Sequence, residues 1–263
     1  MAKMHGTPCW YELCTAKGVL TKAEAFYGEV LGWTAEDAGM EGFTYHLARS
    51  DGDLVAGLME MADDAGAMPP FWMIYFAVDD ADKAVADIEA AGGAVHNAPA
   101  DIPETGRFAV VGDPQGAGFG VLQPAPMADG PPAGRAFDMG KAGHGNWNEL
   151  MTTDPEAGFR FYADLFGWEK GQAVDMGEMG TYQLFAHDGA DIGGMMGLGP
   201  APVPNWLPYF GVSGVTAAIG RIEAGGGKLA HGPMEVPGGA FIAVAQDPQG
   251  AWFAVVGPKE EAS

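Results

Sequence analysis

The sequence is poor in cysteine, in basic residues and in long apolar runs. Its 263 residues include two cysteines, and 13 lysines and arginines stand against 35 aspartates and glutamates, which gives a net charge of −22. Because like charges repel, this excess argues against binding to nucleic acid or to an anionic membrane surface. No apolar run approaches the ~18 residues that a membrane-spanning helix needs. We therefore expect a soluble protein.

The two cysteines give no sign of a disulfide or of a metal site. Cys9 and Cys14 fall in one segment expected to be extended, where a rise of about 3.3 Å per residue places them beyond disulfide reach. No histidine accompanies them at the spacing of a zinc site. We expect two buried thiols. The first residues lack the apolar stretch of a secretory signal, so we expect a cytoplasmic location.

The chain repeats itself at an offset of 134 to 137 residues, and such self-similarity indicates a duplicated structural unit. Trp10-Tyr11-Glu12-Leu13 returns as Trp147-Asn148-Glu149-Leu150, and the turn sequence Asp-Pro-Gln-Gly-Ala occurs at 113–117 and at 247–251. A stretch rich in proline and glycine separates the copies, and it can form neither a helix nor the hydrogen-bond ladder of a β-sheet. We predict a first domain at 1–125, a linker at 126–140 and a second domain at 141–263.

Each copy reads as strand, helix and a few strands, followed by the same pattern again. Capping-box signals at Thr21 and Thr153 each predict a short helix, which ends at Gly32 or Gly167. A second pair of helices is expected from near Asp80 to Gly92-Gly93 and from Ser213 to Gly225. The two Asp-Pro-Gln-Gly sequences are typical of tight turns between strands.

This order of motifs resembles the vicinal oxygen chelate superfamily, which includes glyoxalases, bleomycin-resistance proteins and ring-cleaving dioxygenases. The motifs that carry the resemblance are Phe-Tyr followed by Gly-Trp after the first strand, Gly-Gly after the second helix and the Asp-Pro-Gln-Gly hairpin, and they recur over nearly the whole chain. The resemblance implies an α+β fold of two tandem domains. Each domain consists of two βαβββ units that form a curved, cup-shaped sheet.

Metal-dependent members of this superfamily place histidine, glutamine or glutamate on the first, fourth, fifth and eighth strands of a domain. Hard and borderline cations need nitrogen or oxygen ligands. In this chain the matching positions hold side chains without a nitrogen or oxygen atom that could bind such a cation. We therefore expect no metal and no other cofactor. The matching positions are Trp10, Gly57 to Met59, Met73 and Gly120 in the first copy, and Trp147, Gly194 to Met196, Leu207 and Ala254 in the second.

Alternation along the strands predicts what lines the two cups instead. Glu12 shares a strand face with Trp10, and Glu149 shares one with Trp147. We leave open whether each glutamate pairs with a donor such as Arg107 or is desolvated, in which case its raised pKa would suit a general base. The candidate ligand-binding residues are Trp10, Glu12, Met73, Tyr75, Arg107, Trp147, Glu149, Leu207, Tyr209 and Trp252.

An aromatic cup with one acid suits a small aromatic or amphipathic compound. The first hypothesis is therefore a metal-free small-molecule-binding protein, either a monomer or a homodimer. The alternative is a divergent glyoxalase-type lyase or isomerase that uses Glu12 or Glu149 as a base or metal ligand. A third is a scaffold whose cups are filled. The six histidines do not recur at matched positions, and we expect His144 to be the one nearest a cup.

Overall fold

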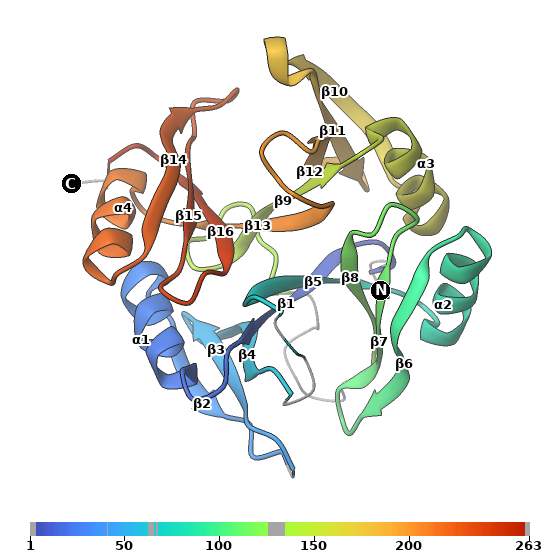
Figure 1. The fold of residues 1–263 in the computed structure, drawn as a ribbon, viewed down its shortest axis with the longest axis horizontal. Coiled ribbons are helices and arrows are strands. Elements are labelled where there is room, and N and C mark those ends of the chain that lie inside the picture. Colours follow the sequence, from blue (N-terminus) through green and yellow to red (C-terminus); the bar gives the residue numbers. More distant parts are fainter. Residues whose placement is uncertain (1–3, 41, 63–65, 67, 126–134, 261–263) are drawn as a thin grey trace. The chain divides into compact units, whose positions relative to one another are not determined.

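The structure is a computed structural model that describes residues 4–40, 42–62, 66, 68–125 and 135–260. Most of the expected linker, 126–134, lies outside the described residues. The first copy contains eight strands and two helices in the expected order (Figure 1). They are β1 (Pro8–Thr15), α1 (Leu20–Leu31), β2 (Thr34–Asp37), β3 (Tyr45–Ser50), β4 (Asp53–Glu60), β5 (Phe71–Ala77), α2 (Ala81–Ala90), β6 (Ala94–Ile102), β7 (Gly106–Gly112) and β8 (Gly118–Pro124).

The second copy repeats this order and adds one short 3₁₀ helix, η1. None of the helices among the described residues is long and apolar enough to span a membrane. The elements are β9 (Gly145–Thr152), α3 (Pro155–Phe166), β10 (Glu169–Asp175), η1 (Gly177–Met179), β11 (Thr181–His187), β12 (Ala190–Gly197), β13 (Asn205–Gly211), α4 (Val215–Ala224), β14 (Lys228–Glu235), β15 (Phe241–Gln246) and β16 (Trp252–Gly257).

Each copy forms one eight-stranded sheet, and the strand orders are equivalent. The orders are β2-β3-β4-β1-β5-β8-β7-β6 and β10-β11-β12-β9-β13-β16-β15-β14. The pairs β1/β4, β5/β8, β9/β12 and β13/β16 are parallel, whereas the hairpins are antiparallel. This mixed topology is that of paired βαβββ units, so the expected α+β class with two tandem domains is confirmed.

Helices α1 and α3 end at the predicted glycines, but the predicted capping boxes do not form at their starts. Gly32 and Gly167 close α1 and α3 in the left-handed conformation, which glycine adopts without strain. The N-cap of α3 is Asp154 rather than Thr153, and its carboxylate accepts a hydrogen bond from the Ala157 amide. Helix α1 begins after Val19, which has no side-chain cap. The capping-box sequence that begins at Thr21 therefore lies inside helix α1.

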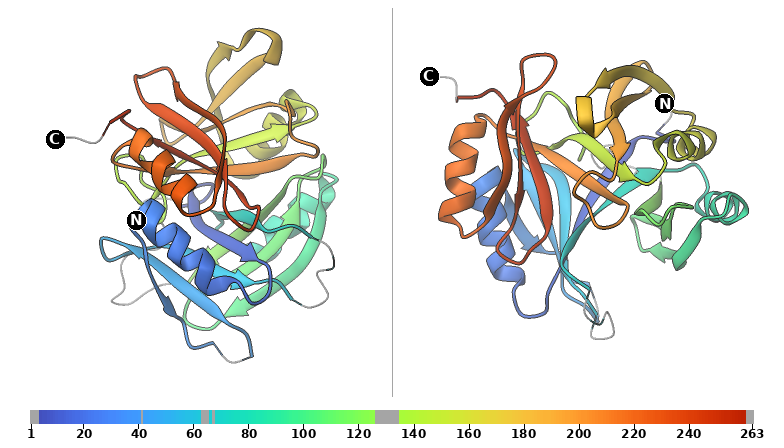
Figure 2. Two further views of the ribbon diagram at one scale, coloured as in Figure 1. Left: turned by 60° about the vertical axis from the view of Figure 1, so that its left-hand side comes forward. Right: turned by 45° about the horizontal axis from the view of Figure 1, so that its top comes forward.

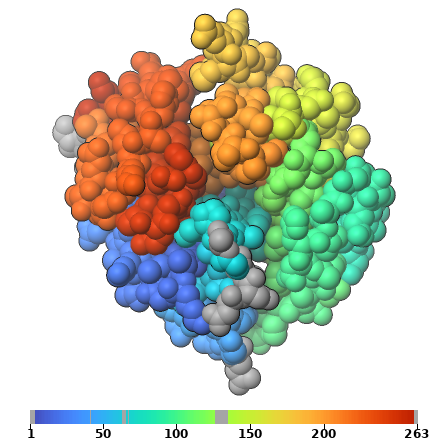
Figure 3. All heavy atoms as spheres, in the orientation of Figure 1, coloured from blue at the N-terminus to red at the C-terminus, as the bar shows by residue number. Residues whose placement is uncertain are grey.

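The chain packs into two compact units, and each unit combines half of one copy with half of the other. Unit 1 comprises Met1–Cys9, Met73–Gly134 and Trp147–Leu207, and unit 2 comprises Trp10–Trp72, Arg135–Asn146 and Pro208–Ser263. In unit 1, α2 packs against α3, and in unit 2, α1 packs against α4. The views of Figure 2 both show α1 beside α4, and the space-filling view in Figure 3 shows the α1 region meeting the last elements of the chain.

Aromatic side chains from the recurring motifs form the core of each unit. In unit 2, Tyr27 stacks on Trp33, with 5.8 Å between the ring centroids. In unit 1, Tyr162 stacks on Trp168 at 5.5 Å, and Trp168 stacks on Phe185 at 4.4 Å. Burial of each such side chain contributes roughly 1.5–3 kcal/mol to stability. The Phe-Tyr and Gly-Trp motifs are thus explained by packing.

The Asp-Pro-Gln-Gly turns also have a structural role. Asp113 and Asp247 are buried, and each accepts hydrogen bonds from backbone amides of its own turn. Each carboxylate also accepts a hydrogen bond from a tyrosine of the other copy. These bonds, both 3.0 Å long, run from Tyr162 to Asp113 and from Tyr27 to Asp247. The turn of one copy therefore docks on the first helix of the other.

Candidate functional site

A hydrogen-bonded chain of tryptophan, tyrosine and glutamate lies on the face of β1 and β4. The indole Nε1 of Trp10 donates to the Tyr45 hydroxyl at 2.9 Å, and that hydroxyl donates to Oε2 of Glu12, also at 2.9 Å. Trp10 and Glu12 are both partly exposed. Since both reach the same hydroxyl, the prediction that they share a strand face is confirmed.

The same chain exists in the second copy, on the face of β9 and β12. Trp147 Nε1 donates to the Tyr182 hydroxyl at 2.8 Å, and Tyr182 is hydrogen bonded to Glu149. Burial, followed by the nearby glutamate charge, raises the pKa of Tyr45 and of Tyr182 well above the ordinary value. Both phenols therefore stay protonated at neutral pH and act as donors to the carboxylates.

Two glycines make room for these tyrosines. Glu12 lies opposite Gly57 in the β1/β4 register, and Glu149 lies opposite Gly194 in the β9/β12 register. A Cβ atom at Gly57 would come within 1.9 Å of the Tyr45 hydroxyl oxygen, and one at Gly194 would come within 2.2 Å of the Tyr182 ring. The tyrosine rings therefore occupy the space in which a longer fourth-strand side chain would have to lie.

The face of β5 and β8 is apolar and more tightly closed. Tyr75 lies opposite Gly120, and a Cβ atom at Gly120 would come within 2.0 Å of the Tyr75 ring. Phe108 of β7 packs near the Tyr75 ring, with 6.5 Å between the centroids. Tyr75 and Met73 are only 4% and 9% exposed. These two predicted site residues therefore present little surface to a ligand in this conformation.

The equivalent face of β13 and β16 differs at its edge. Leu207 and Tyr209 of β13 are 2% and 4% exposed, and Ala254 of β16, opposite Tyr209, is fully buried. Trp252 shares the strand face of Ala254 and is 46% exposed. Among the predicted ligand-binding residues of these two apolar faces, Trp252 is the one that is exposed to solvent.

The prediction that Arg107 lines a cup is wrong. Arg107 donates to Asp82 of α2 through Nε and Nη2, at 2.7 and 2.9 Å, and to Asp101 of β6 at 2.9 Å. Its neighbour Phe108 points toward Tyr75, and consecutive residues of a strand point to opposite faces. Arg107 therefore lies on the helix side of β7, where two aspartates attract its charge more directly than a distant glutamate could.

The residues present do not fit a metal centre of the kind expected from the resemblance. Among the described residues, no group of three or more histidine, cysteine, aspartate or glutamate side chains could hold a metal ion. At the matching positions of β1 and β4, an indole and a glycine stand in place of donors, and Tyr45 fills the space above the glycine. These positions therefore do not supply the ligands that the resemblance implies.

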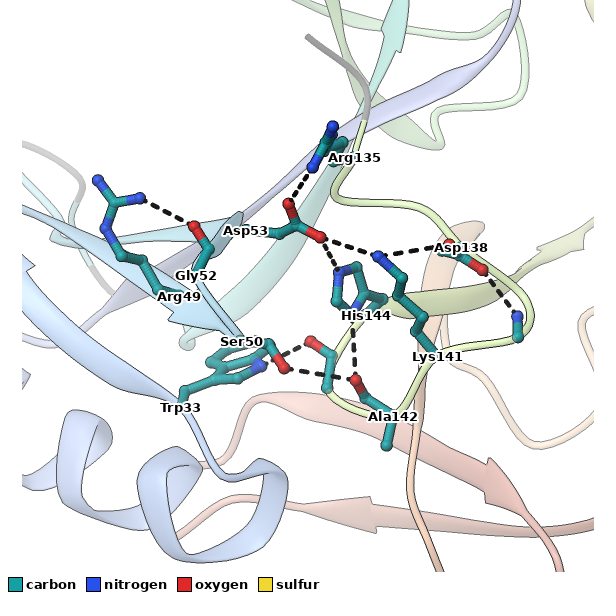
Figure 4. Close-up of polar contacts among 12 residues, drawn as sticks. Trp33, Arg49, Ser50, Gly52, Asp53, Arg135, Asp138, Lys141, Ala142 and His144 are labelled. Atoms are coloured by element: carbon teal, nitrogen blue, oxygen red, sulfur yellow. Dashed lines mark hydrogen bonds and ion pairs between the residues drawn. The ribbon is translucent and has the colours of Figure 1, made fainter. Parts of the chain in front are cut away.

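His144, which we expected near a cup, belongs to a different cluster in unit 2 (Figure 4). Asp53, at the start of β4, accepts hydrogen bonds from Arg135 at 2.8 Å and from Lys141 at 2.9 Å. The buried imidazole of His144 lies between this carboxylate and a backbone carbonyl, with Nε2 3.4 Å from Asp53 Oδ2 and Nδ1 3.0 Å from the Ala142 oxygen. The cluster fastens residues 135–146 to the β3/β4 hairpin.

Two cavities of the described part of the chain are lined by residues other than those of the Trp-Tyr-Glu chains. One, of about 310 Å³, lies beside α3 and the first Asp-Pro-Gln-Gly turn. The other, of about 230 Å³, lies between the end of α1 and α4. Both are bordered by residues that lie between packed helices and turns. The Trp-Tyr-Glu chains are the candidate functional site because they recur in both copies.

The chain belongs to the Glyoxalase/Bleomycin resistance protein/Dioxygenase superfamily, whose family model matches residues 16–121 and 144–255. Glyoxylase CFP32 of Mycobacterium bovis, so named provisionally, is 33% identical over 261 residues, which cover 97% of this chain and 95% of the relative. The anthracycline biosynthesis protein DnrV of Streptomyces peucetius is 33% identical over 273 residues, covering 97% and 94%.

A solved structure shares the fold. The Mn(II)-bound glyoxalase from Novosphingobium aromaticivorans superposes with a TM-score of 0.66 and 17% identity, covering 99% of this chain and 84% of that one. Together with the family match, this likeness confirms the expected superfamily.

Proposed function

We propose that the protein binds a small, flat aromatic compound without a metal. The observation that carries this proposal is the Trp-Tyr-Glu chain, which both copies possess in the same geometry. Each chain places a partly exposed indole near a partly exposed carboxylate. An indole supplies apolar contact and stacking, while a carboxylate accepts a hydrogen bond from a ligand hydroxyl or amine.

The tyrosine gives this pair a fixed geometry. Because its hydroxyl accepts from the indole and donates to the carboxylate, it fixes the distance and orientation of both groups before a ligand arrives. Such preorganisation lowers the entropy lost on binding. A relative of this chain is named for anthracycline biosynthesis, and anthracyclines are flat, hydroxylated ring systems. That likeness supports an aromatic, hydroxylated ligand class.

The test is a fluorescence titration of purified protein that was never exposed to a chelating resin. We expect hydroxylated aromatic compounds to quench tryptophan emission with saturation, and we expect Trp147→Ala and Glu149→Ala to weaken that binding. Arg107→Ala is the control, because Arg107 lies on the helix side of its strand. A panel that produces no saturable quenching would favour a scaffold with filled cups instead.

The alternative is a glyoxalase-type lyase or isomerase in which Glu12 or Glu149 removes a proton. The family match and the provisionally named glyoxylase relative favour it. A tyrosine that donates to the glutamate would hold the carboxylate in place for such a transfer. The discriminating assay supplies methylglyoxal and a small thiol, with and without added Mn(II). Turnover that is lost in Glu149→Gln or Glu12→Gln would establish the enzyme.

A further inference from the structure

An imidazole caps the end of helix α3 in unit 1. The backbone amide of Asp79 donates a hydrogen bond of 3.3 Å to Nδ1 of His5. Because a backbone amide can only donate, the ring proton lies on Nε2. Nε2 is 3.0 Å from the carbonyl oxygen of Leu165, in the last turn of α3, and donates to it. The last four carbonyls of a helix have no partner within the helix, so His5 satisfies one of them.

Unit 2 repeats this backbone but has alanine in place of the histidine. Gly6 in unit 1 and Gly143 in unit 2 have positive φ angles of 85° and 72°. The carbonyl of each glycine accepts a hydrogen bond from the tryptophan of a Gly-Trp motif, and the amide of each donates to β5 or β13. The residue before the glycine is His5 in unit 1 and Ala142 in unit 2. Since the backbones match, these two side chains occupy equivalent places.

The cavity of about 230 Å³ in unit 2 lies where the imidazole lies in unit 1. Ala142 lines it, and so do the residues that match the two partners of His5. These are Val30, which matches Leu165 and lies in the last turn of α1, and Ser213, which matches Asp79. Pockets for drug-sized ligands measure roughly 300–1,000 Å³. This smaller cavity therefore suits a single small ring.

We propose that this cavity binds a small azole, a neutral five-membered ring that carries one N–H donor. The ring N–H donates to the Val30 carbonyl, as His5 does to its own helix end. The guanidinium of Arg221 lines the same cavity, with Nη2 3.5 Å from the Val30 oxygen, and it repels a cationic ring. Glu29 also lines the cavity but is exposed, so solvent screens its charge. This site is separate from the Trp-Tyr-Glu chains and independent of the aromatic binding proposed for them.

The experiment titrates the full chain with two isomers, 4-methylimidazole and 1-methylimidazole, and follows backbone amide signals by NMR at a pH at which both rings are neutral. The isomers have the same size, but only 4-methylimidazole has an N–H. We expect 4-methylimidazole to shift the amide signals of Gly32 and Val212, which line the cavity, in a saturable manner. We expect 1-methylimidazole to bind about 2- to 12-fold more weakly, the value of one hydrogen bond.

Two variants exchange the units. Ala142→His fills the cavity of unit 2 with an imidazole of the chain itself, as in unit 1, and should abolish azole binding there. His5→Ala opens the equivalent place in unit 1 and should add a second site, seen as new shifts at the amide of Asp79.

Ala25→His is the matched control, because Ala25 is exposed on α1 and lies outside the cavity lining. It should bind 4-methylimidazole as the wild type does. Thermal unfolding checks that each variant keeps the fold. The inference is overturned if 4-methylimidazole gives no saturable shifts, if both isomers bind equally, or if folded Ala142→His still binds at the same amides. Absence of a second site in folded His5→Ala also contradicts it.

Discussion

The hydroxyl of Tyr27 donates a 3.0 Å hydrogen bond to Oδ2 of Asp247, although 220 residues separate them along the chain. The same hydroxyl accepts a bond of 2.9 Å from Trp72 Nε1. All three residues are buried. Burial raises the pKa of Asp247, while the bonds from Tyr27 and from the turn amides oppose that rise. This tyrosine therefore stabilises a buried carboxylate that would otherwise be costly to keep.

Tyr27→Phe should lower the free energy of unfolding by about 1–3 kcal/mol, because it leaves the Trp72 indole without its acceptor and removes the tyrosine hydroxyl that donates to Oδ2 of the buried Asp247. Urea unfolding measures the change. Tyr162→Phe is the matched variant, since Tyr162 makes the equivalent bonds to Asp113 and Trp206. A loss below about 0.5 kcal/mol in both variants would show that the Tyr-Asp bonds do not hold the turns in place.

Gly120→Ala and Gly118→Ala should differ in stability although they lie two residues apart. A methyl group at position 120 would overlap the Tyr75 ring, whereas one at position 118 would make ordinary contacts. We expect Gly120→Ala to cost about 1–3 kcal/mol through forced displacement of the ring, and Gly118→Ala to cost little. Thermal unfolding of the two variants tests this. Equal stabilities would contradict the placement of Tyr75 across Gly120.

Asp53→Asn should destabilise the protein in a pH-dependent manner. Hydrogen bonds from Arg135, and then from Lys141, hold the pKa of Asp53 far below its ordinary value. A carboxyl whose pKa is lowered on folding contributes stability above its unfolded pKa and loses it as the pH falls toward the folded pKa. The difference in Tm between wild type and Asp53→Asn should therefore be largest near pH 7 and shrink below about pH 4.

Asp138→Asn is the control for that series, because Asp138 is more exposed and its carboxylate lies 3.9 Å from Lys141. It should change Tm little at any pH. If the wild-type and Asp53→Asn proteins kept the same gap in Tm from pH 7 to pH 3, the ionised carboxylate would not be the source of the stabilisation.

Cys9 and Cys14 should resist thiol reagents in the native protein. Both are free and buried, and burial raises the pKa of each thiol far above the ordinary range. Since the thiolate is the reactive form, a colorimetric disulfide reagent should label neither cysteine at pH 8 and both in guanidinium chloride. Rapid labelling of native protein would mean that β1 opens readily.

Much of the fold was predictable because it is encoded in local signals that recur. The glycines at positions 32 and 167 end helices in both copies, and strand alternation correctly placed Glu12 on the same face as Trp10. The superfamily followed from the order of the motifs. These features depend on residues that are close in sequence, so a pattern alone identifies them.

The features that were missed depend on partners that are distant in sequence. Tyr45 and Tyr182 complete the polar chains from β3 and β11, and only the pairing of those strands with β4 and β12 shows that they reach Glu12 and Glu149. The sequence repeat contained one signal for these tyrosines. The offset between Tyr45 and Tyr182 equals the offset between the two tryptophans of the chains. Likewise, no pattern showed that Arg107 faces α2.

We propose that the Trp-Tyr-Glu chains bind aromatic compounds without a metal. The most direct measurement is the titration of chelator-treated protein with 1,4-dihydroxyanthraquinone, in parallel for wild type and for the double variant Tyr45→Phe/Tyr182→Phe. We expect the wild type to bind saturably, with an affinity that added Mn(II) does not change, and we expect the variant to bind more weakly. Binding that appears only after Mn(II) is added, or that the variant retains in full, would contradict it.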